Sequence, residues 1–428
     1  MKRKKFSPIH LLYLIPVLLG LVLYVSGCNA GTSGDSTTQD DPVTVKSWTF
    51  MVYMAGDNDL EAAGWLDLNE MEQVGTSDSV NVIVQFDRSG LAPAPNGKGC
   101  GRYVITRNPS TADPTAPWTT FKSPQVEKLG NVNSGDPDTL VDFVEWGMKN
   151  YPANKYAVIV WNHGSGWRGK DVAALHKGIC YDDTSNDYIT ENELKYAFGK
   201  INESYGKKIE FIGMDACLMG MLEVAYDMKD YGKYLVGSEV SISAYGWPYH
   251  LVLADLVADP SFSGKNLASS AVTNFKTFYE GSSDYGPNSS IVALKLSGIA
   301  DLATAVNDFS TLAVENIDAE AAGLKTAFDA TQKADSTSYS DFKDLRDFMY
   351  QVTQNCPTLS SSANAVIDAQ ASATSYYWNG SAMSATSGGL SIWLPNAAFF
   401  NTFDTSYEAL SFGKDNAWYT FLTKFVVQ

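Results

Sequence analysis

The sequence predicts an α/β fold with a mostly parallel central sheet, for two reasons. Apolar runs of strand length alternate with segments of helical periodicity from Thr49 onward. Two of the runs, 157–161 and 211–214, are continuously apolar, which is typical of strands buried on both faces. These two runs are followed by reactive side chains, His163 and Cys217. Because ligands bind at the carboxyl ends of strands in such sheets, we expect the functional site there.

Composition limits the classes of function. A chain of 428 residues is long enough for one enlarged domain or two, and 45% hydrophobic residues supply ample core. The formal charge of −17 argues against nucleic acid as a partner, because no excess of Lys and Arg is available to contact phosphates. An acidic enzyme surface fits better, and it would attract cationic substrates.

The N-terminus predicts an export signal. Four basic residues, 2–5, precede the apolar run Leu11–Val25, which is short for a membrane span. The run leads into Val-Ser-Gly-Cys28, which resembles a bacterial lipobox. We therefore expect residues 1–27 to be a lipoprotein signal peptide and residues 28–46 to be a flexible tether from lipidated Cys28. The protein would then lie in the cell envelope, lipid-anchored to a bacterial membrane, while an uncleaved anchor is the alternative.

The segment from 47 to 255 predicts the catalytic core. A capping residue at Asp138 and the capping box from Thr190 to Glu193 mark two helix starts. Residues 88–138, rich in Gly, Pro, Ser and Asn, are interpreted as an excursion from the main sheet with one short strand at most. The expected strands are 49–54, 80–86, 102–106, 157–161, 211–214 and 234–238, and the expected helices are 60–73, 138–149, 190–198 and 222–231.

The segment from 256 to 428 predicts a helix-rich C-terminal portion that completes the sheet. Helical spacing of apolar residues marks helices around 275–279, 342–349 and 366–371. Two late strands, 290–296 and 390–394, are expected to rejoin the central sheet.

Elimination favours His163 and Cys217 as a base and nucleophile. His10 lies in the export signal, which leaves His163, His176 and His250. His163 and Cys217 each follow a buried strand and have a nearby glycine, Gly164 or Gly220, that would let a substrate backbone approach. This placement supports the first pair. The rival pair, His176 and Cys180, is expected in a loop without a strand to fix its geometry.

The alternative for Cys100, Cys180, Cys217 and Cys356 is that they form disulfides. His250 is expected to pack or to form hydrogen bonds.

Other chemistries fit the sequence less well. Ser165 lacks the first glycine of a G-x-S-x-G elbow, and three histidines spread along the mature chain do not suggest a zinc site. The acidic residues Asp182, Asp183 and Asp187 resemble a calcium loop without its central glycine, and a solvated turn is the commoner reading. No cofactor is assigned, and a requirement for calcium stays open.

Four motifs of the chain carry a resemblance to a known family: WTFMVYMAGDNDLE at 48–61, NHGSGW at 162–167, GICYDD at 178–183 and MDACLM at 214–219. Through these matching motifs the chain resembles the clostripain family of cysteine peptidases. The resemblance is close over residues 48–249 and looser beyond, through 389–395. It implies a caspase-like three-layer α/β/α sandwich, shared with gingipains and legumains, and cleavage after basic residues.

The resemblance implies roles for individual residues. Cys217 would be the nucleophile, His163 its partner, and Asp215 part of the pocket for the P1 side chain, so that peptides and proteins with Arg or Lys at P1 would be substrates. The backbone N–H groups of Gly164 and Cys217 are candidates for the oxyanion hole. The alternative for Asp215 is that it caps the following helix.

Family members are made as zymogens that cut themselves between the His and the Cys. A basic residue on a flexible loop beside the site is a candidate position, so Lys177 is preferred, with Lys170 and Arg168 behind it. Two alternatives remain for the whole protein: a glycan-binding surface lipoprotein that uses exposed aromatic residues, and an inactive scaffold with the peptidase fold.

Overall fold

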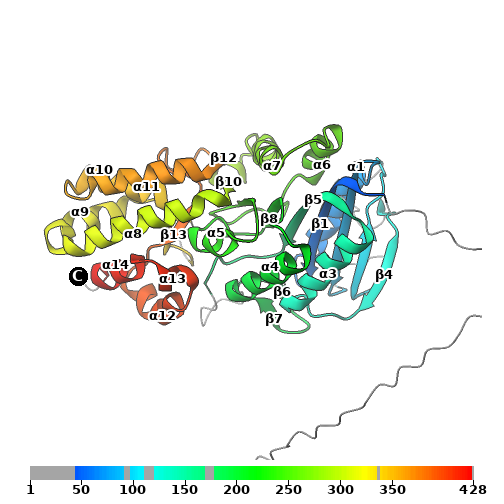
Figure 1. The fold of residues 1–428 in the computed structure, drawn as a ribbon, viewed down its shortest axis with the longest axis horizontal. Helices are drawn as coiled ribbons and strands as arrows, with labels where there is room; N and C mark the ends of the chain where they lie inside the picture. Colours follow the sequence, from blue (N-terminus) through cyan, green and yellow to red (C-terminus); the bar gives the residue numbers. More distant parts are fainter. Residues whose placement is uncertain (1–43, 91–96, 110–119, 169–177, 335–337, 427–428) are drawn as a thin grey trace, which may run out of the picture. The chain divides into compact units, whose positions relative to one another are not determined.

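The computed structural model describes residues 44–90, 97–109, 120–168, 178–334 and 338–426. These residues belong to one compact unit, Val43–Gln428 (Figure 1). The expected signal peptide, Cys28 and residues 29–43 of the expected tether lie outside the described residues, whereas Lys46, the last residue of that tether, begins the first strand. Within the described residues, no helix has both the length and the apolar character needed to cross a bilayer.

The centre of the unit is a nine-stranded sheet with the order β12-β10-β9-β8-β5-β1-β2-β3-β4. Its middle strands run parallel to one another and are almost wholly buried, as their continuous apolar runs predict. The mostly parallel sheet is therefore confirmed. These strands are β1 (Lys46–Gly56), β2 (Val80–Arg88), β5 (Ala153–Trp161), β8 (Phe211–Asp215) and β9 (Tyr234–Gly237).

Antiparallel strands extend the sheet at both edges. On one side lie β3 (Cys100–Val104) and β4 (Gln125–Gly130), so residues 88–138 are not an excursion from the sheet as the sequence predicted. On the other side β10 (Ser290–Lys295) rejoins the sheet as expected, followed by β12 (Thr374–Asn379). The strands β4 and β12 escaped prediction because they are half-exposed edge strands: β4 has no apolar run, and β12 has only the short aromatic run 376–378.

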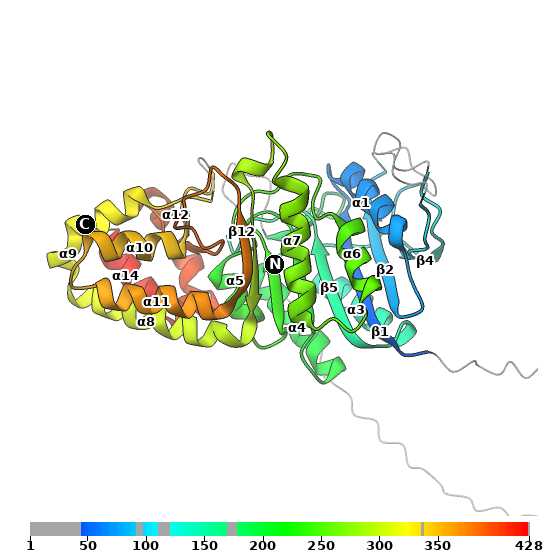
Figure 2. The ribbon, with the colours of Figure 1, turned by 90° about the horizontal axis from the view of Figure 1, so that it is seen from above.

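Helices cover both faces of the sheet, which makes the three-layer sandwich. In Figure 1, α6 and α7 lie above the strands and α3 and α4 below them, and Figure 2 views the same arrangement from above. The helices next to the parallel strands are α1 (Glu61–Val74), α3 (Pro137–Asn150), α4 (Glu191–Tyr205), α5 (Leu222–Met228), α6 (Tyr249–Ala258) and α7 (Gly264–Tyr279). The capping box from Thr190 to Glu193 is present at the start of α4.

Two hydrophobic cores result, one on each face. Alternate residues of β1 feed them: Met51 and Tyr53 enter the core beneath α3 and α4, and Phe50 and Val52 enter the core beneath α1, α6 and α7. Because alternate side chains of β1 enter different cores, both faces of the strand need apolar residues, and its sequence is a continuous apolar run. Both sides of the strand face a helix layer.

The C-terminal portion is helix-rich, as predicted, and gathers beyond β10 and β12 (Figure 1). Its small sheet pairs β11 (Phe342–Asp344) with β13 (Ser391–Trp393). The expected strand at 390–394 therefore does not join the central sheet, because its ladder partner is β11. The helices are α8 (Ile299–Glu315), α9 (Ile317–Ala330), α10 (Leu345–Asn355), α11 (Ser360–Ala373), α12 (Ala397–Glu408), α13 (Ser411–Asp415) and α14 (Trp418–Phe425).

A small hairpin and two single turns complete the described elements. The hairpin is β6 (Ile179–Asp182) with β7 (Asp187–Ile189), and the 3₁₀ turns are Gly286–Asn288 and Leu296–Gly298. Cys180 is thus a strand residue rather than the loop residue that the sequence suggested.

Candidate active site

The carboxyl ends of β5 and β8 bring His163 and Cys217 into one pocket. These strands are parallel neighbours, and Trp161 is paired with Asp215 in the ladder. Each reactive residue follows its strand end by two positions, so both extend from the same edge of the sheet. His163, Asp215 and Cys217 all line a pocket of about 190 Å³. An imidazole, a carboxyl and a thiol therefore face the same small volume.

His163 is held by a carboxylate that the strand argument did not single out. Its Nε2 lies 2.7 Å from Oδ1 of Asp59, in the segment after β1. The imidazole is about one quarter exposed, and the Asp59 carboxylate is largely exposed. A carboxylate at one ring nitrogen favours one tautomer and stabilises the imidazolium when a proton arrives. Asp59 lies within the matching motif at 48–61, but no pattern in the sequence pairs it with His163.

Cys217 carries a thiol that is neutral in this state. Burial raises the pKa of the Cys217 thiol, and its contacts with Ile242 and Ser241 oppose that rise only in part. The thiol donates to the Ile242 carbonyl at 3.7 Å, and the Ile242 N–H donates to Sγ at 3.3 Å. A thiol of this kind needs a base to become a nucleophile. Cys100, Cys180, Cys217 and Cys356 are all free thiols.

Two glycines, Gly164 and Gly220, allow the loops that carry His163 and Cys217 to pack closely against neighbouring backbone. A Cβ atom at Gly164 would overlap the Cys217 carbonyl oxygen, and one at Gly220 would lie 2.6 Å from the Ser238 carbonyl carbon. The sequence interpretation assigned these glycines to a close approach of substrate. The structure gives a different reason, since here they permit packing between loops.

Asp215 lies in the pocket wall with one oxygen unused. Its Oδ2 accepts from the Tyr249 hydroxyl at 2.8 Å and from the Trp247 N–H at 3.3 Å. Its Oδ1 is buried and has no hydrogen-bond partner among the described residues. Burial raises the pKa of Asp215 to about 7, the two donors oppose the rise, and the nearby Glu70 carboxylate adds to it. A buried oxygen of this kind suits a cationic group entering the pocket.

The interpretation of Asp215 as a helix cap is wrong. The next helix, α5, begins only at Leu222, and its N-cap position is Met221. The Asp215 carboxylate instead lies close beneath Gly246, where a Cβ would stand 2.9 Å from Oδ2.

Further acids stand behind the pocket. Asp67 accepts from the indole N–H of Trp161 at 2.6 Å, and burial raises its pKa, with Asp215 and Glu70 adding to the rise. The Nδ1 of His250 lies 3.1 Å from Oε2 of Glu70. His250 therefore contacts this acidic layer, in keeping with the structural role expected for it.

The other candidates that the structure describes do not line this pocket. Arg168 is buried and pairs with Asp341, far along the chain. His176, Lys170 and Lys177 lie outside the described residues. The rival pair of His176 and Cys180 is therefore placed only in part, with Cys180 buried in β6.

The acidic residues of the suspected calcium loop separate, and only Asp182 joins a cluster. Its partners are Asp57, after β1, and Asp87, at the end of β2; their ligand atoms lie within 4.8 Å of one another. Burial raises the pKa of Asp87 to about 7, and the Asp182 and Asp57 charges add to the rise. Oδ1 of Asp57 is buried without a hydrogen-bond partner among the described residues. Three carboxylates with an unused oxygen fit a hard cation such as Ca²⁺.

An α/β/α sandwich that brings a thiol and an imidazole to the carboxyl edge of its sheet agrees with the caspase-like fold that the sequence predicted. The sequence model of the clostripain family matches residues 52–425. The chain therefore belongs to the clostripain family.

Individual relatives agree with this assignment. The chain is 33% identical over 192 residues to clostripain of Hathewaya histolytica; the match covers 42% of this chain and only 36% of that protein, about a third of its length. It resembles the structure of a secreted C11 cysteine protease of Bacteroides thetaiotaomicron with an irreversible peptide inhibitor (TM-score 0.64, 22% identity, 85% of this chain and 97% of that one). It also resembles an inactive zymogen C11 protease of Parabacteroides distasonis (TM-score 0.65, 22% identity, 87% and 99%). At this identity the two structures support the fold alone.

Proposed function

We propose that the protein is a cysteine endopeptidase that cleaves peptide bonds after Arg or Lys. One observation carries the proposal: His163, Cys217 and Asp215 line one pocket, and Asp215 has a buried oxygen without a hydrogen-bond partner among the described residues. The thiol and imidazole supply nucleophile and base, and the carboxylate supplies selectivity for a basic P1 side chain.

The reaction follows from these groups. His163 takes the Cys217 proton, and Sγ attacks the scissile carbonyl carbon. Backbone N–H groups of Gly164 and Cys217 are the candidate donors to the oxyanion. The imidazolium, stabilised by Asp59, then gives its proton to the leaving amine. Water hydrolyses the thioester by the reverse sequence and restores the thiol.

Substrate selectivity would come from Asp215. A P1 guanidinium or ammonium that pairs with Oδ1 replaces the missing hydrogen-bond partner and favours the ionised carboxylate. A neutral P1 side chain would leave the buried oxygen unsatisfied, which costs about 1–3 kcal/mol.

Hydrolysis of paired reporter peptides tests the proposal. Peptides identical except for Arg, Lys or norleucine at P1 should be cleaved by the wild type in the first two cases and far more slowly in the third. Cys217→Ala should abolish cleavage, while Cys356→Ala, which removes a buried thiol outside the pocket, should retain it. Residual activity in Cys217→Ala would contradict the proposed nucleophile.

An Arg- or Lys-chloromethylketone probe tests the alternatives. A peptidase would be labelled at Cys217, as mass spectrometry of the modified peptide would show. A glycan-binding lipoprotein or an inactive scaffold would stay unlabelled.

We further propose self-cleavage between His163 and Cys217, with Lys177 first and Lys170 second among the candidate positions. Arg168 is the weakest candidate because its side chain is buried. Wild type and Cys217→Ala incubated side by side should differ, with two fragments forming only in the wild type. Fragments from the mutant would exclude self-cleavage.

The proposed location is the bacterial envelope, through a lipid on Cys28. The supporting observation is the sequence of the first 28 residues. The wild type should partition into a detergent phase and Cys28→Ala should not. Equal partitioning would contradict the anchor.

A further inference from the structure

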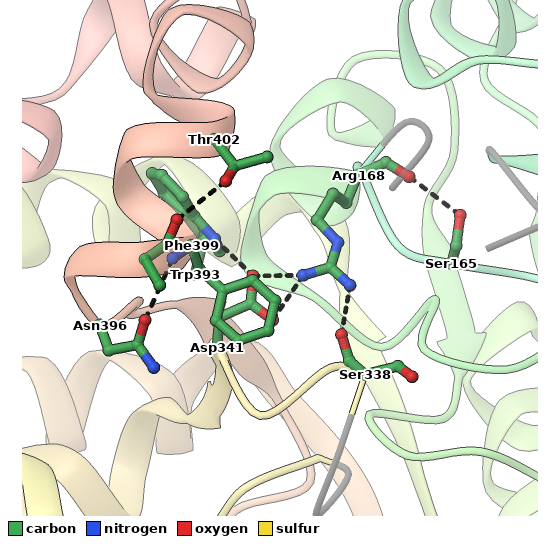
Figure 3. Close-up of polar contacts among 9 residues, drawn as sticks. Ser165, Arg168, Ser338, Asp341, Trp393, Asn396, Phe399 and Thr402 are labelled. Atoms are coloured by element: carbon green, nitrogen blue, oxygen red, sulfur yellow. Dashed lines mark hydrogen bonds and ion pairs between the residues drawn. The ribbon is translucent and has the colours of Figure 1, made fainter. Parts of the chain in front are cut away.

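Arg168, at the end of the loop that carries His163, is buried in an ion pair with the C-terminal portion. Its Nη1 donates to both carboxylate oxygens of Asp341, at 2.7 and 2.6 Å, and its Nη2 donates to the Ser338 carbonyl (Figure 3). Arg168 is 2% exposed and Asp341 is 1% exposed. One guanidinium nitrogen thus bonds the Asp341 carboxylate and the other bonds the Ser338 carbonyl, which fixes the orientation of the planar group.

Aromatic rings surround the guanidinium. Its Cζ lies 4.6 to 5.3 Å from the ring centroids of Tyr339, Phe342, Phe399 and Phe403. The preceding residue, Trp167, packs edge-on against Trp393 and Tyr407, with centroids 5.2 and 5.0 Å away. The segment 167–168 is therefore anchored by charge and by packing together.

Asp341 links this anchor to the Cys217 side of the site. Its Oδ2 also accepts from the indole N–H of Trp393, at 2.8 Å, in β13. The same strand donates from Ser391 N to the Gly220 carbonyl at 2.9 Å, beside the Cys217 loop. One short strand thus supports both catalytic loops.

Ser165 ties the two ends that flank residues 169–177. Its hydroxyl donates to the Arg168 carbonyl at 3.0 Å and accepts from the Gly178 N–H at 2.7 Å. The Ser165 N–H also donates to the Gly178 carbonyl at 3.0 Å. Each flank is therefore bonded to the scaffold without relying on the chain between them.

We propose that Arg168 is a positioning residue that keeps the His163 loop in place after the chain is cut between residues 168 and 178. The inference rests on the proposed self-cleavage. In the intact chain, covalent continuity to Gly178 also restrains this loop. Hydrolysis converts residue 170 or 177 into a free carboxylate end. The ion pair with Asp341 then holds the loop together with the packing of Trp167 and the hydrogen bonds of Ser165. Burial also shields Arg168 from the enzyme's own selectivity for basic residues.

The first test compares the cleaved enzymes. Arg168→Lys keeps the charge but has no second nitrogen to donate to the Ser338 carbonyl, and the pair Arg168→Met with Asp341→Leu replaces the ion pair by apolar side chains. In both cleaved variants kcat should fall roughly 10- to 100-fold with little change in KM, as expected for a displaced catalytic group. Arg102→Lys is the matched control, because Arg102 is also buried and pairs with two carboxylates, Glu127 and Asp142, far from the pocket.

The proposal is overturned if cleaved Arg168→Lys keeps the wild-type kcat, or if Arg102→Lys loses as much. Thermal unfolding of each variant in the Cys217→Ala background shows whether the uncut fold is intact. If Arg168→Lys or the double variant does not fold, the kcat of the other one decides the test.

The second test is a gain of cleavage. Intact masses of wild-type fragments should end at Lys170 or Lys177, whereas Asp341→Asn, which releases the guanidinium, should add a fragment that ends at Arg168. A wild-type fragment ending at Arg168 would overturn the proposal. If the wild type is not cut at all, the self-cleavage fails instead. A recognition site for an external protease inserted within 169–177 then decides the role of Arg168 by the same kcat comparison.

Discussion

At the scale of single residues, the proposed selectivity for basic P1 residues depends on the charge of Asp215, which burial controls. Its carboxyl is 3% exposed, so it loses hydration, and its pKa rises to about 7. Only the ionised form pairs with a cationic P1 side chain. The ionised fraction grows as the pH rises through about 7, so recognition should strengthen in that direction.

We therefore expect kcat/KM for Arg and Lys reporters to increase between about pH 6 and about pH 8, mainly through a lower KM. Asp215→Asn should remove this dependence through KM and lower kcat/KM by roughly 30-fold or more, the equivalent of about 2 kcal/mol for a lost buried charge pair. A norleucine reporter serves as the control, since its KM should not follow this titration. An unchanged Arg-to-norleucine ratio in Asp215→Asn would contradict the role.

Asp59 should affect turnover rather than binding. Because it contacts the His163 ring and does not line the pocket, Asp59→Asn should lower kcat a few-fold and leave KM nearly unchanged. The effect is modest because water competes at this exposed carboxylate. Asp308→Asn, an exposed acid on α8, is the control. A rise in KM with constant kcat would argue against an orienting role.

The site could be predicted from the sequence only where side chains follow strands. His163, Asp215 and Cys217 stand at or just after the ends of two buried strands, so their common edge follows from the parallel arrangement. The contact of Asp59 with His163 spans 104 positions and depends on the path of a loop. The contact of Ile242 with Cys217 is likewise made by irregular backbone, which leaves no periodic signal.

At the scale of elements, α5 contributes a buried carboxyl that makes stability depend on pH. Glu223 accepts from the Trp393 N–H and the Tyr407 hydroxyl, both at 2.9 Å. Burial nevertheless raises its pKa to about 7, and these donors only moderate the rise. The folded state thus holds a proton at pH values where the unfolded chain has released it.

The raised pKa of Glu223 should make the free energy of unfolding fall as the pH rises. Between about pH 4.5 and about pH 7 the folded state binds more protons at Glu223 than the unfolded state, so this contribution, about 3 kcal/mol, is present below that range and is lost as the pH rises through it. Glu223→Gln cannot ionise. In urea titrations, the free energy of unfolding of Glu223→Gln minus that of the wild type should therefore increase as the pH rises. A pH-independent difference would contradict the assignment.

The ends of β1, β2 and β6 should bind calcium together. With Ca²⁺ at about 100 times its Kd, the gain of about 2.7 kcal/mol should raise Tm by roughly 3 °C relative to EDTA. Asp87→Asn should lose this rise, and Asp308→Asn should keep it. If Ca²⁺ does not change the Tm of the wild type, the cluster does not bind calcium, and shared protons rather than a cation relieve the repulsion among the three carboxylates.

Among the elements, the inner strands were predictable and the outer ones were not. Burial on both faces forces an apolar run in β5 and β8, whereas β4 needs apolar residues on one side only. The pairing of β13 with β11, rather than with the central sheet, depends on long-range packing around Trp393, which no local pattern reports.

At the scale of the whole molecule, the proposed cut would separate the chain but not the fold. The strand β5 precedes the cut and β8 follows it, and the two are paired in one ladder. After cleavage, the two fragments should elute together in size-exclusion chromatography and separate only in denaturant. Separation in native buffer would contradict this arrangement.

The contact between Gly164 and the Cys217 carbonyl oxygen has a meaning for related sequences. Any side chain at this position would force the two loops apart while leaving thiol and imidazole in the sequence. A homologous chain with alanine or serine there is therefore expected to be a pseudoenzyme. A motif search that checks only for the reactive pair would count it as active.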